Sequence, residues 1–216
     1  MRRFFFTFAL CLIWSLPAVA ERYQGCTDQQ NQIIHDALGS AKDLTHKAAG
    51  TIGDTADYQR WFGDYSQANA EQVRANLKAI VTALRGGGVT AICETLRPEG
   101  CSPGEYAWVY SDQPYLMRLC PAFFTLPPLT ALAPGTRRSE NGTREGTLVH
   151  EISHFTRVAG TEDHCYSRPE CQRMARNNPL RAIDNADSYQ YFTEDVTYYA
   201  RQPIADKPPP APRASR

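Results

Sequence analysis

The sequence has no excess of charge of either sign. Its 216 residues include 23 Lys and Arg against 23 Asp and Glu, so the formal net charge is zero. It also lacks a basic cluster interleaved with aromatic residues, and we therefore expect no nucleic-acid partner. No internal repeat is present, and the length suits one domain with its own core.

The only marked apolar run near the N-terminus, Phe4 to Leu16, is too short to span a bilayer. Arg2 and Arg3 precede it, and Ala18-Val19-Ala20 follows it as a small-x-small cleavage site. This pattern predicts a signal peptide over residues 1–20. We expect a secreted protein, extracellular or periplasmic, without a stable membrane anchor.

The cysteines contain no CxxC pair, which argues against a zinc site built from thiolates. One of the seven cysteines lies in the expected signal peptide, and the others are Cys26, Cys93, Cys101, Cys120, Cys165 and Cys171. An even number in an exported chain indicates disulfides, although sequence alone leaves their pairing open. The short separation of Cys165 and Cys171 makes them the expected local pair.

The most informative stretch is His150-Glu151-Ile152-Ser153-His154, an HExxH motif. Residues four apart share one face of a helix, so the two imidazoles can bind one metal ion. Glu151 can reach a metal-bound water as a general base. Asp163 follows nine residues after the second His, which is enough chain to turn and return a carboxylate as third ligand. Three protein ligands plus water are typical of a catalytic zinc.

Other residues remain candidates for the third ligand. His164 neighbours Asp163, but adjacent side chains normally point in different directions. Glu170 and Glu194 are alternative carboxylates, of which Glu194 on the expected last helix is the better. Asp163 ranks first and Glu194 second.

The pattern of apolar residues predicts an α+β fold, mostly helical with a small β-sheet. The folded domain should span residues 21–202, and the Pro-rich tail 203–216 should be disordered. Helices are expected at residues 27–49, 69–84, 145–157 and 182–200, strands at 89–95 and 106–111, an extended segment at 114–124 and an aromatic-packed connection at 53–63. Thr27 or Asp28 is the expected cap of the first helix.

These motifs resemble the deuterolysin family of secreted zinc endopeptidases, the aspzincins. That family combines HExxH with a GTxD element, matched here by Gly160-Thr161-Glu162-Asp163, and places a Tyr three residues later, matched by Tyr166. The stretch 185–192 is similar to the family's sequence near the substrate pocket. The resemblance covers roughly residues 23–200.

The resemblance implies a zincin-like, disulfide-stabilised metallopeptidase domain with one catalytic Zn²⁺. His150, His154 and Asp163 would be the metal ligands, and Glu151 the general base. Tyr166 would donate a hydrogen bond to the developing oxyanion. The alternative role of Tyr166 is packing beside Cys165.

Two positions depart from the family pattern. Tyr166 is followed by Ser167, where many relatives have Gly. Members that cleave before lysine carry an Asp and, three positions later, a Glu in the substrate pocket. Asp187 matches the Asp, but Gln190 replaces the Glu. One carboxylate pairs with a lysine ammonium more weakly than two, so any preference for Lys on the leaving-group side should be weak.

The expected function is therefore a secreted zinc-dependent endopeptidase that acts, as a monomer, on protein or peptide substrates. Alternatives are a non-catalytic binding module that keeps a structural metal and a protease toxin with a narrow target. Glu151 favours an enzyme, because a purely structural site needs no general base. A strand such as residues 107–110 could bind an extended substrate by edge pairing.

Overall fold

Two long helices form the frame of the molecule. In the computed structural model, which describes residues 22–86, 88–133 and 142–201, α1 spans Asp28–Ala49 and α3 spans Gln67–Arg85. The predicted cap of α1 is confirmed, because the Thr27 side chain accepts a hydrogen bond from the Gln30 amide and the Gln30 side chain accepts one from the Thr27 amide. Each helix buries an apolar face in the common core.

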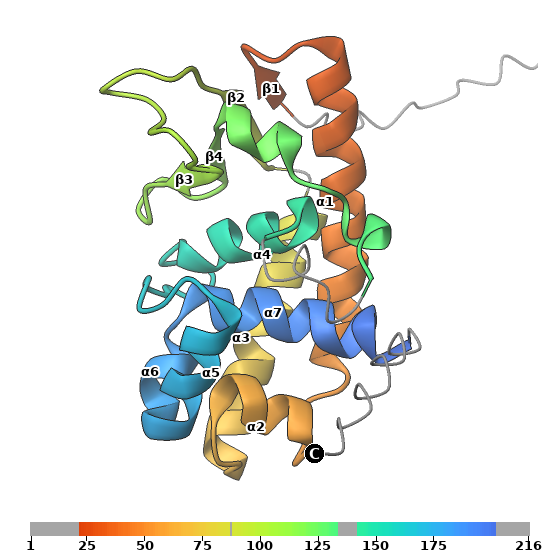
Figure 1. Ribbon diagram of the computed structural model, residues 1–216, viewed down its shortest axis with the longest axis vertical. Coiled ribbons are helices and arrows are strands. Elements are labelled where there is room, and N and C mark those ends of the chain that lie inside the picture. Colours follow the sequence, from red (N-terminus) through yellow and green to blue (C-terminus); the bar gives the residue numbers. More distant parts are fainter. Residues whose placement is uncertain (1–21, 87, 134–141, 202–216) are drawn as a thin grey trace, which may run out of the picture.

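A small sheet lies at one end of the molecule (Figure 1). Its strands are β1 (Arg22–Gln24), β2 (Thr90–Cys93), β3 (Ala107–Val109) and β4 (Leu116–Leu119), in the order β1-β2-β4-β3. The pairs β1–β2 and β2–β4 are parallel, whereas β3 pairs with β4 antiparallel. Strand β3 therefore forms one edge of the sheet. Two 3-10 turns, η1 (Pro121–Thr125) and η2 (Leu129–Ala131), follow β4.

Helices α4 (Arg144–His154) and α7 (Ala186–Thr197) cross the middle of the molecule, packed against each other. Helices α2 (Ala56–Phe62), α5 (Arg168–Asn177) and α6 (Pro179–Ile183) lie at the end away from the sheet (Figure 1). The 3-10 turn η4 (Tyr199–Arg201) follows α7. The sheet thus lies on one side of α4, and the group of α2, α5 and α6 lies on the other.

Three expected boundaries were wrong. The segment 53–63 is not only a connection, because residues 56–62 form α2, whose Phe62 packs on Tyr189 and Phe192 of α7 with ring centroids 5.2 Å apart. Helix α4 ends at His154 rather than residue 157, because Phe155 adopts an extended ψ of 125°. The last helix begins at Ala186 rather than residue 182, because Pro179–Ile183 forms a separate helix.

Three disulfides cross-link the described residues. Cys26–Cys93 joins the start of α1 to β2, Cys101–Cys120 joins the loop before β3 to the end of β4, and Cys165–Cys171 joins the loop after α4 to α5. The expected local pair is confirmed. The predicted signal peptide and the Pro-rich tail lie outside the described residues.

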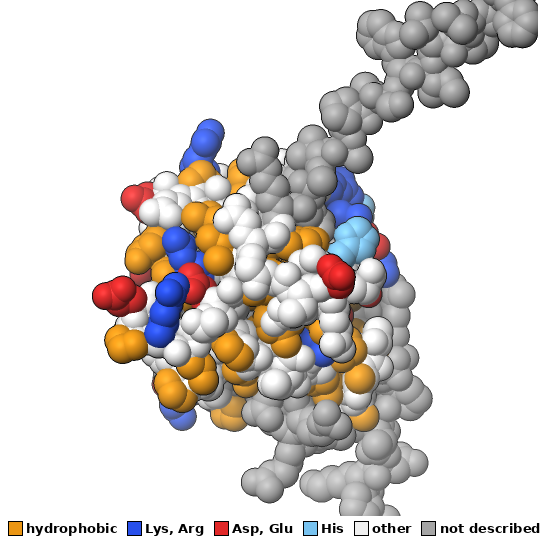
Figure 2. Space-filling view, turned by 90° about the horizontal axis from the view of Figure 1, so that it is seen from above, with side chains coloured by type: hydrophobic (Ala, Val, Ile, Leu, Met, Phe, Trp, Pro, Cys, Tyr) orange, Lys and Arg blue, Asp and Glu red, His pale blue; other side chains and the backbone are white. Residues whose placement is uncertain are grey.

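The surface mixes charge types. Figure 2, which views the molecule from the sheet end, shows acidic and basic side chains scattered among apolar ones. Among the described helices, none combines the length and apolarity that crossing a bilayer requires.

Candidate metal centre

The last turn of α4 carries the two histidines of the HExxH motif. Thr143 caps this helix by accepting a hydrogen bond from the Gly146 amide at 2.9 Å. His150 and His154 lie one turn apart with ring centroids separated by 4.8 Å, and both line a cleft of about 950 Å³. Phe155 directly after the helix is fully buried and packs edge-on against Tyr115, which fixes the end of α4 beside the sheet.

The loop after α4 returns Asp163 to the histidines. Gly160 has a φ of +61°, a left-handed conformation that glycine adopts without a side-chain clash, and it reverses the chain. The hydroxyls of Ser153 and Thr161 lie 2.6 Å apart, and the Thr161 amide donates to the Ser153 carbonyl at 3.2 Å. These contacts fold the loop back along the helix that carries the first two ligands.

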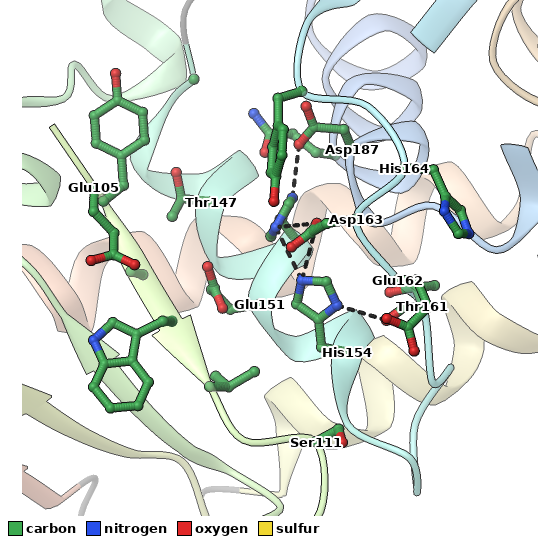
Figure 3. Close-up of a pocket in the computed structure, with 18 of the residues that line it drawn as sticks. Glu105, Ser111, Thr147, Glu151, His154, Thr161, Glu162, Asp163, His164 and Asp187 are labelled. Atoms are coloured by element: carbon green, nitrogen blue, oxygen red, sulfur yellow. Dashed lines mark hydrogen bonds and ion pairs between the residues drawn. The ribbon is translucent and has the colours of Figure 1, made fainter. Parts of the chain in front are cut away.

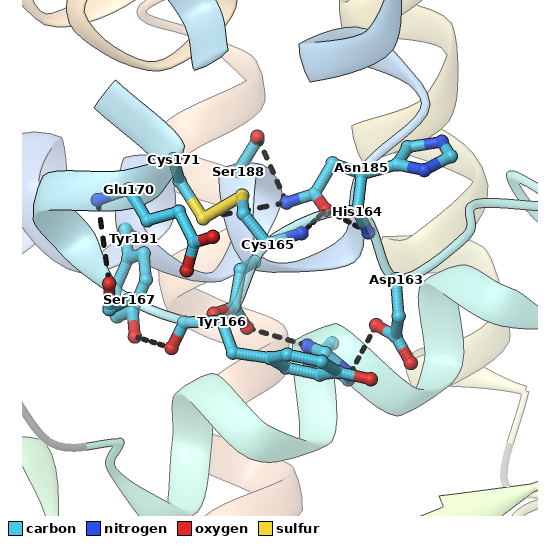
Figure 4. The surroundings of a disulfide bond; sticks show 12 residues. Asp163, His164, Cys165, Tyr166, Ser167, Glu170, Cys171, Asn185, Ser188 and Tyr191 are labelled. Atoms are coloured by element: carbon cyan, nitrogen blue, oxygen red, sulfur yellow. Dashed lines mark hydrogen bonds and ion pairs between the residues drawn. A yellow bond between two sulfur atoms is a disulfide. The ribbon is translucent and has the colours of Figure 1, made fainter. Parts of the chain in front are cut away.

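Asn185 holds the other side of the Asp163 loop (Figure 4). Its side-chain oxygen accepts hydrogen bonds from the amides of His164 at 2.8 Å and Cys165 at 3.1 Å. The disulfide from Cys165 to Cys171 ties the same segment to α5. Asp163 is thus presented by a loop that is fixed on both sides.

Three ligand atoms converge at this place (Figure 3). The Nε2 atoms of His150 and His154 are 3.1 Å apart, and Asp163 Oδ1 lies 3.2 Å from the first and 3.4 Å from the second. Ligand atoms bound at about 2.0–2.1 Å to a tetrahedral zinc ion lie about 3.3 Å from one another. The three side chains therefore fit a zinc ion without rearrangement and leave the fourth position open.

The partners of the histidines support a cation at this point. His154 Nδ1 donates to the Thr161 carbonyl at 2.7 Å, and His150 Nδ1 faces the Asp187 carboxylate at 2.7 Å. Protons on both Nδ1 atoms leave both Nε2 atoms of the neutral rings as lone-pair donors to a metal. Three such acceptor atoms at hydrogen-bond distance repel one another unless a cation lies between them.

Without a metal ion, protons on the histidines provide the positive charge between these acceptor atoms. Burial lowers the pKa of His150, but hydrogen bonds to Asp163 and Asp187 raise it further, to well above its usual value. For Asp163, burial raises the pKa of the carboxyl group. The two histidines outweigh this effect, so the pKa of Asp163 lies below its usual range. The ligand set thus attracts positive charge.

Glu151 lies in the wall of the cleft next to the ligand cluster (Figure 3). Its side chain is buried, and burial raises the pKa of its carboxyl group, whereas His150 and His154 lower it. A carboxylate with a raised pKa beside an open metal position has the properties of a general base.

Tyr166 projects into the cleft rather than into the core. It is 66% exposed, which is incompatible with a packing role beside Cys165. Burial of its hydroxyl and the nearby Asp163 carboxylate raise the pKa of Tyr166 to about 12. The hydroxyl keeps its proton at neutral pH and is available as a hydrogen-bond donor.

The alternative third ligands are placed elsewhere. His164 Nε2 pairs with Asp184 at 3.0 Å, and Glu170 lies exposed in the first turn of α5. Glu194 is buried, where it binds Arg168 at 2.5 Å and the Thr143 hydroxyl at 2.7 Å. Of the described carboxylates, Asp163 is the one that converges with both histidines.

Asp187 and Gln190 both line the cleft from α7. The sequence did not predict that Asp187 would contact a ring nitrogen of His150. The roles of Thr161 and Asn185 in holding the ligands were also missed, because hydrogen-bond partners are not encoded in spacing. The only sequence signal for them was their place inside the two stretches that resemble the family.

Known proteins match this chain over most of its length. The profile of the aspzincin family, described as lysine-specific metallo-endopeptidase, matches residues 44–194. An extracellular protease of Aeromonas hydrophila is 33% identical over 175 residues, which cover 79% of this chain and 46% of the relative. A peptidyl-Lys metalloendopeptidase of Pleurotus ostreatus is 33% identical over 178 residues, which cover 80% of this chain and 96% of the relative.

The fold has a solved counterpart. A zinc peptidase from Grifola frondosa superposes with a TM-score of 0.67 at 25% identity, covering 79% of this chain and 98% of that chain. The mostly helical, disulfide-stabilised fold with a small sheet is thereby confirmed. This chain spans about half the length of the Aeromonas relative and nearly all of the Pleurotus relative. By the extent of these matches, the chain belongs to the aspzincin family of zinc metalloendopeptidases, which are hydrolases acting on peptide bonds.

Proposed function

We propose that this protein is a secreted zinc-dependent endopeptidase with one catalytic zinc ion. The observation that carries the proposal is the convergence of His150, His154 and Asp163 beside the buried Glu151 in an open cleft. A structural metal site needs neither the general base nor the cleft. This arrangement favours an enzyme over a non-catalytic binding module.

The chain's own residues have separable tasks in peptide hydrolysis. A bound zinc ion would bring the pKa of its water close to neutrality and polarise the scissile carbonyl. Glu151 takes a proton from the attacking water and passes it to the leaving amine. The Tyr166 hydroxyl donates a hydrogen bond to the oxygen on which negative charge develops.

The edge strand β3 is the proposed platform for the substrate backbone. Residues 104–111 line the cleft, and β3 pairs with β4 on its other side. An extended peptide can add to such an edge through main-chain hydrogen bonds. The cleft would then hold the scissile bond between β3 and the metal ligands of α4.

A weak preference for lysine on the leaving-group side is the finer part of the proposal. Asp187 lines the cleft as a carboxylate, but Gln190 one turn later on α7 is neutral. The relatives named peptidyl-Lys metalloendopeptidases support a basic substrate residue. The engagement of Asp187 with His150 leaves less of its charge for a substrate.

Secretion and a monomeric domain over residues 21–202 complete the proposal. Three disulfides suit an oxidising compartment, and the pattern of residues 1–20 is typical of a signal peptide. A protease toxin with one protein target would use the same chemistry. The breadth of cleavage therefore decides between a general protease and a toxin.

The test uses the purified mature chain, Glu21 to Arg216, with a denatured protein as substrate and mass spectrometry of the products. Chelation and Glu151→Gln should each abolish cleavage, while Glu151→Gln still binds one zinc ion per chain. Glu99→Gln, an exposed site outside the cleft, is the control and should cleave normally. Full cleavage by Glu151→Gln, or by the zinc-free protein, would disprove the proposed mechanism.

A further inference from the structure

The wall of the cleft is acidic. Among the described residues that line it, five are acidic (Glu105, Glu151, Glu162, Asp163 and Asp187) and none is Lys or Arg. Three of these carboxylates already have tasks as general base, metal ligand and partner of His150. Glu162 is exposed in the loop that carries Asp163. Glu105 is half-buried, and the hydrolytic chemistry gives it no task.

Glu105 is held rigidly just before the edge strand. Its Oε2 accepts a hydrogen bond from the Ser102 amide at 2.8 Å, and its own amide donates to the Ser102 carbonyl at 3.2 Å. The Cys101–Cys120 disulfide closes this turn, and the Cys120 amide donates to the Tyr106 carbonyl at 2.9 Å. A carboxylate fixed in this way loses little conformational entropy when it binds a cation.

Among the described residues, Glu105 also has no cationic partner. No Lys, Arg or His within ion-pair distance of its carboxylate occurs in the described part of the chain. A half-buried carboxylate that faces a cleft without a counter-ion attracts a positively charged ligand group. The peptide that occupies this cleft can supply that group.

The position of Glu105 places it at the end of the cleft that contains Gln190. The side chain of Tyr106, the next residue, lies near those of Thr147 and Gln190 around Gly142. A Cβ atom added to Gly142 would lie 3.7 Å from Tyr106, 3.6 Å from Thr147 and 3.5 Å from Gln190. Figure 3 shows Glu105 and Thr147 on one side of Glu151, whereas Ser111 lies apart from them at another end of the pocket. Glu105 therefore follows directly on the stretch of the wall that Tyr106 shares with Gln190, and it adds to this cleft a negative charge that Gln190 does not supply.

We infer that Glu105 is a specificity-determining residue that binds the cationic side chain of a substrate Lys or Arg on the leaving-group side of the cut. It selects the substrate and takes no part in the bond cleavage. The inference rests on the proposed endopeptidase function. In a pocket built on α7 alone, Asp187 would be the only charge that selects the substrate. Here a second selecting charge comes from the loop before β3.

Two peptides that differ only in the residue after the cleaved bond, Lys or its neutral isostere norleucine, test this inference with the zinc-loaded enzyme. In Glu105→Gln, kcat/KM for the Lys peptide should fall about five- to tenfold, the effect of losing one partly desolvated ion pair. Hydrolysis of the norleucine peptide should stay within about twofold. The matched control Glu99→Gln, in the same loop region but outside the cleft, should change neither value.

A charge reversal makes the test independent of any general loss of activity. Glu105→Lys should reverse the preference, so that a peptide with Glu at that position is cleaved faster than the Lys peptide. Equal losses on both peptides in Glu105→Gln, or an unchanged Lys preference, would overturn the inference while leaving the endopeptidase function intact. Failure of the wild type to cleave either peptide in a zinc-dependent way would instead disprove the proposed function, and this inference with it.

Discussion

At the residue scale, the three proposed metal ligands are held in place by groups outside the ligand set. His150 and His154 were predictable from their spacing, because one turn of helix brings residues four apart to the same face. The convergence of Asp163 with the two histidines was predictable only as the first of several options, since several carboxylates follow the motif. The carboxylate of Asp187, which orients the His150 ring from a different helix, was not predictable as such. Its contact depends on how α7 packs against α4.

Removal of this carboxylate should weaken the zinc site. Asp187→Asn keeps the size of the side chain but replaces a charged acceptor for the His150 Nδ1 proton, and zinc affinity should fall about 10- to 100-fold. Competition with a chromophoric chelator measures the affinity directly. Asp184→Asn is the matched control, because Asp184 pairs with His164, which is not a ligand. An unchanged zinc affinity in Asp187→Asn would limit Asp187 to a role in substrate binding.

At the element scale, the fit of α4 against α7 explains a glycine in the first turn of α4. Gly146 costs helix propensity, yet a Cβ at this position would overlap Glu194 Oε1 and lie 2.8 Å from Gln190 Cγ. Gly146→Ala should therefore destabilise the protein by about 2 kcal/mol through overpacking. Gly39→Ala on α1, where the new Cβ meets nothing within 4 Å, should stabilise it by up to about 1 kcal/mol. Urea denaturation of both variants measures the contrast, and equal effects would contradict the close approach of the helices.

Helix α2 illustrates what the sequence could not reveal at this scale. Residues 53–63 contain aromatic residues close to Gly53 and Gly63, so the segment was interpreted as a connection, although its aromatic packing was correctly expected. Seven residues make too short a helix to leave a clear periodic pattern, and packing on α7 stabilises it. The long amphipathic helices α1 and α3 were predictable because their apolar positions repeat over several turns.

Tyr58 on α2 should make stability sensitive to alkaline pH. Burial and the neighbouring Tyr65 raise the pKa of Tyr58 to about 12, whereas an unfolded chain ionises its tyrosines near pH 10. The unfolded state then binds fewer protons than the folded state between these values, so the free energy of unfolding falls as pH rises from about 10 to 12. The slope for this residue is about 1.4 kcal/mol per pH unit.

Tyr58→Phe should reduce that slope by about 1.4 kcal/mol per pH unit, as measured by urea denaturation between pH 8 and 12. Burial also raises the pKa of Tyr189, Tyr191 and Tyr199, and these tyrosines contribute to the slope that remains. At pH 7 the substitution should be neutral or slightly stabilising, because the Tyr58 hydroxyl is buried without a hydrogen-bond partner among the described residues. Tyr110→Phe, at an exposed tyrosine on the sheet edge, is the control and should leave the alkaline slope unchanged. An alkaline slope in Tyr58→Phe equal to that of the wild type would contradict the raised pKa of Tyr58.

At the scale of the whole molecule, the disulfides divide between global stability and the metal site. Cys26–Cys93 closes a loop of 67 residues between α1 and the sheet, whereas Cys165–Cys171 closes one of 6 residues beside Asp163. The loss of chain entropy in the unfolded state grows with loop length, which gives about 4 kcal/mol for the first bond and about 2 kcal/mol for the second. Their effects on zinc binding should follow the opposite order, because the shorter bond ties down the segment that Asn185 holds next to the third ligand.

Two paired variants test this division. Cys26→Ala/Cys93→Ala should lower the free energy of unfolding of the zinc-free protein by about 4 kcal/mol and leave zinc affinity within about threefold at a temperature where the protein is folded. Cys165→Ala/Cys171→Ala should cost about half as much stability and weaken zinc binding about tenfold. Stability must be compared with chelator present, because zinc stabilises the folded state in proportion to its affinity and would mix the two effects. If the long-loop variant lost more zinc affinity than the short-loop variant, the metal site would depend on the sheet and α1 rather than on the cross-linked loop that follows α4.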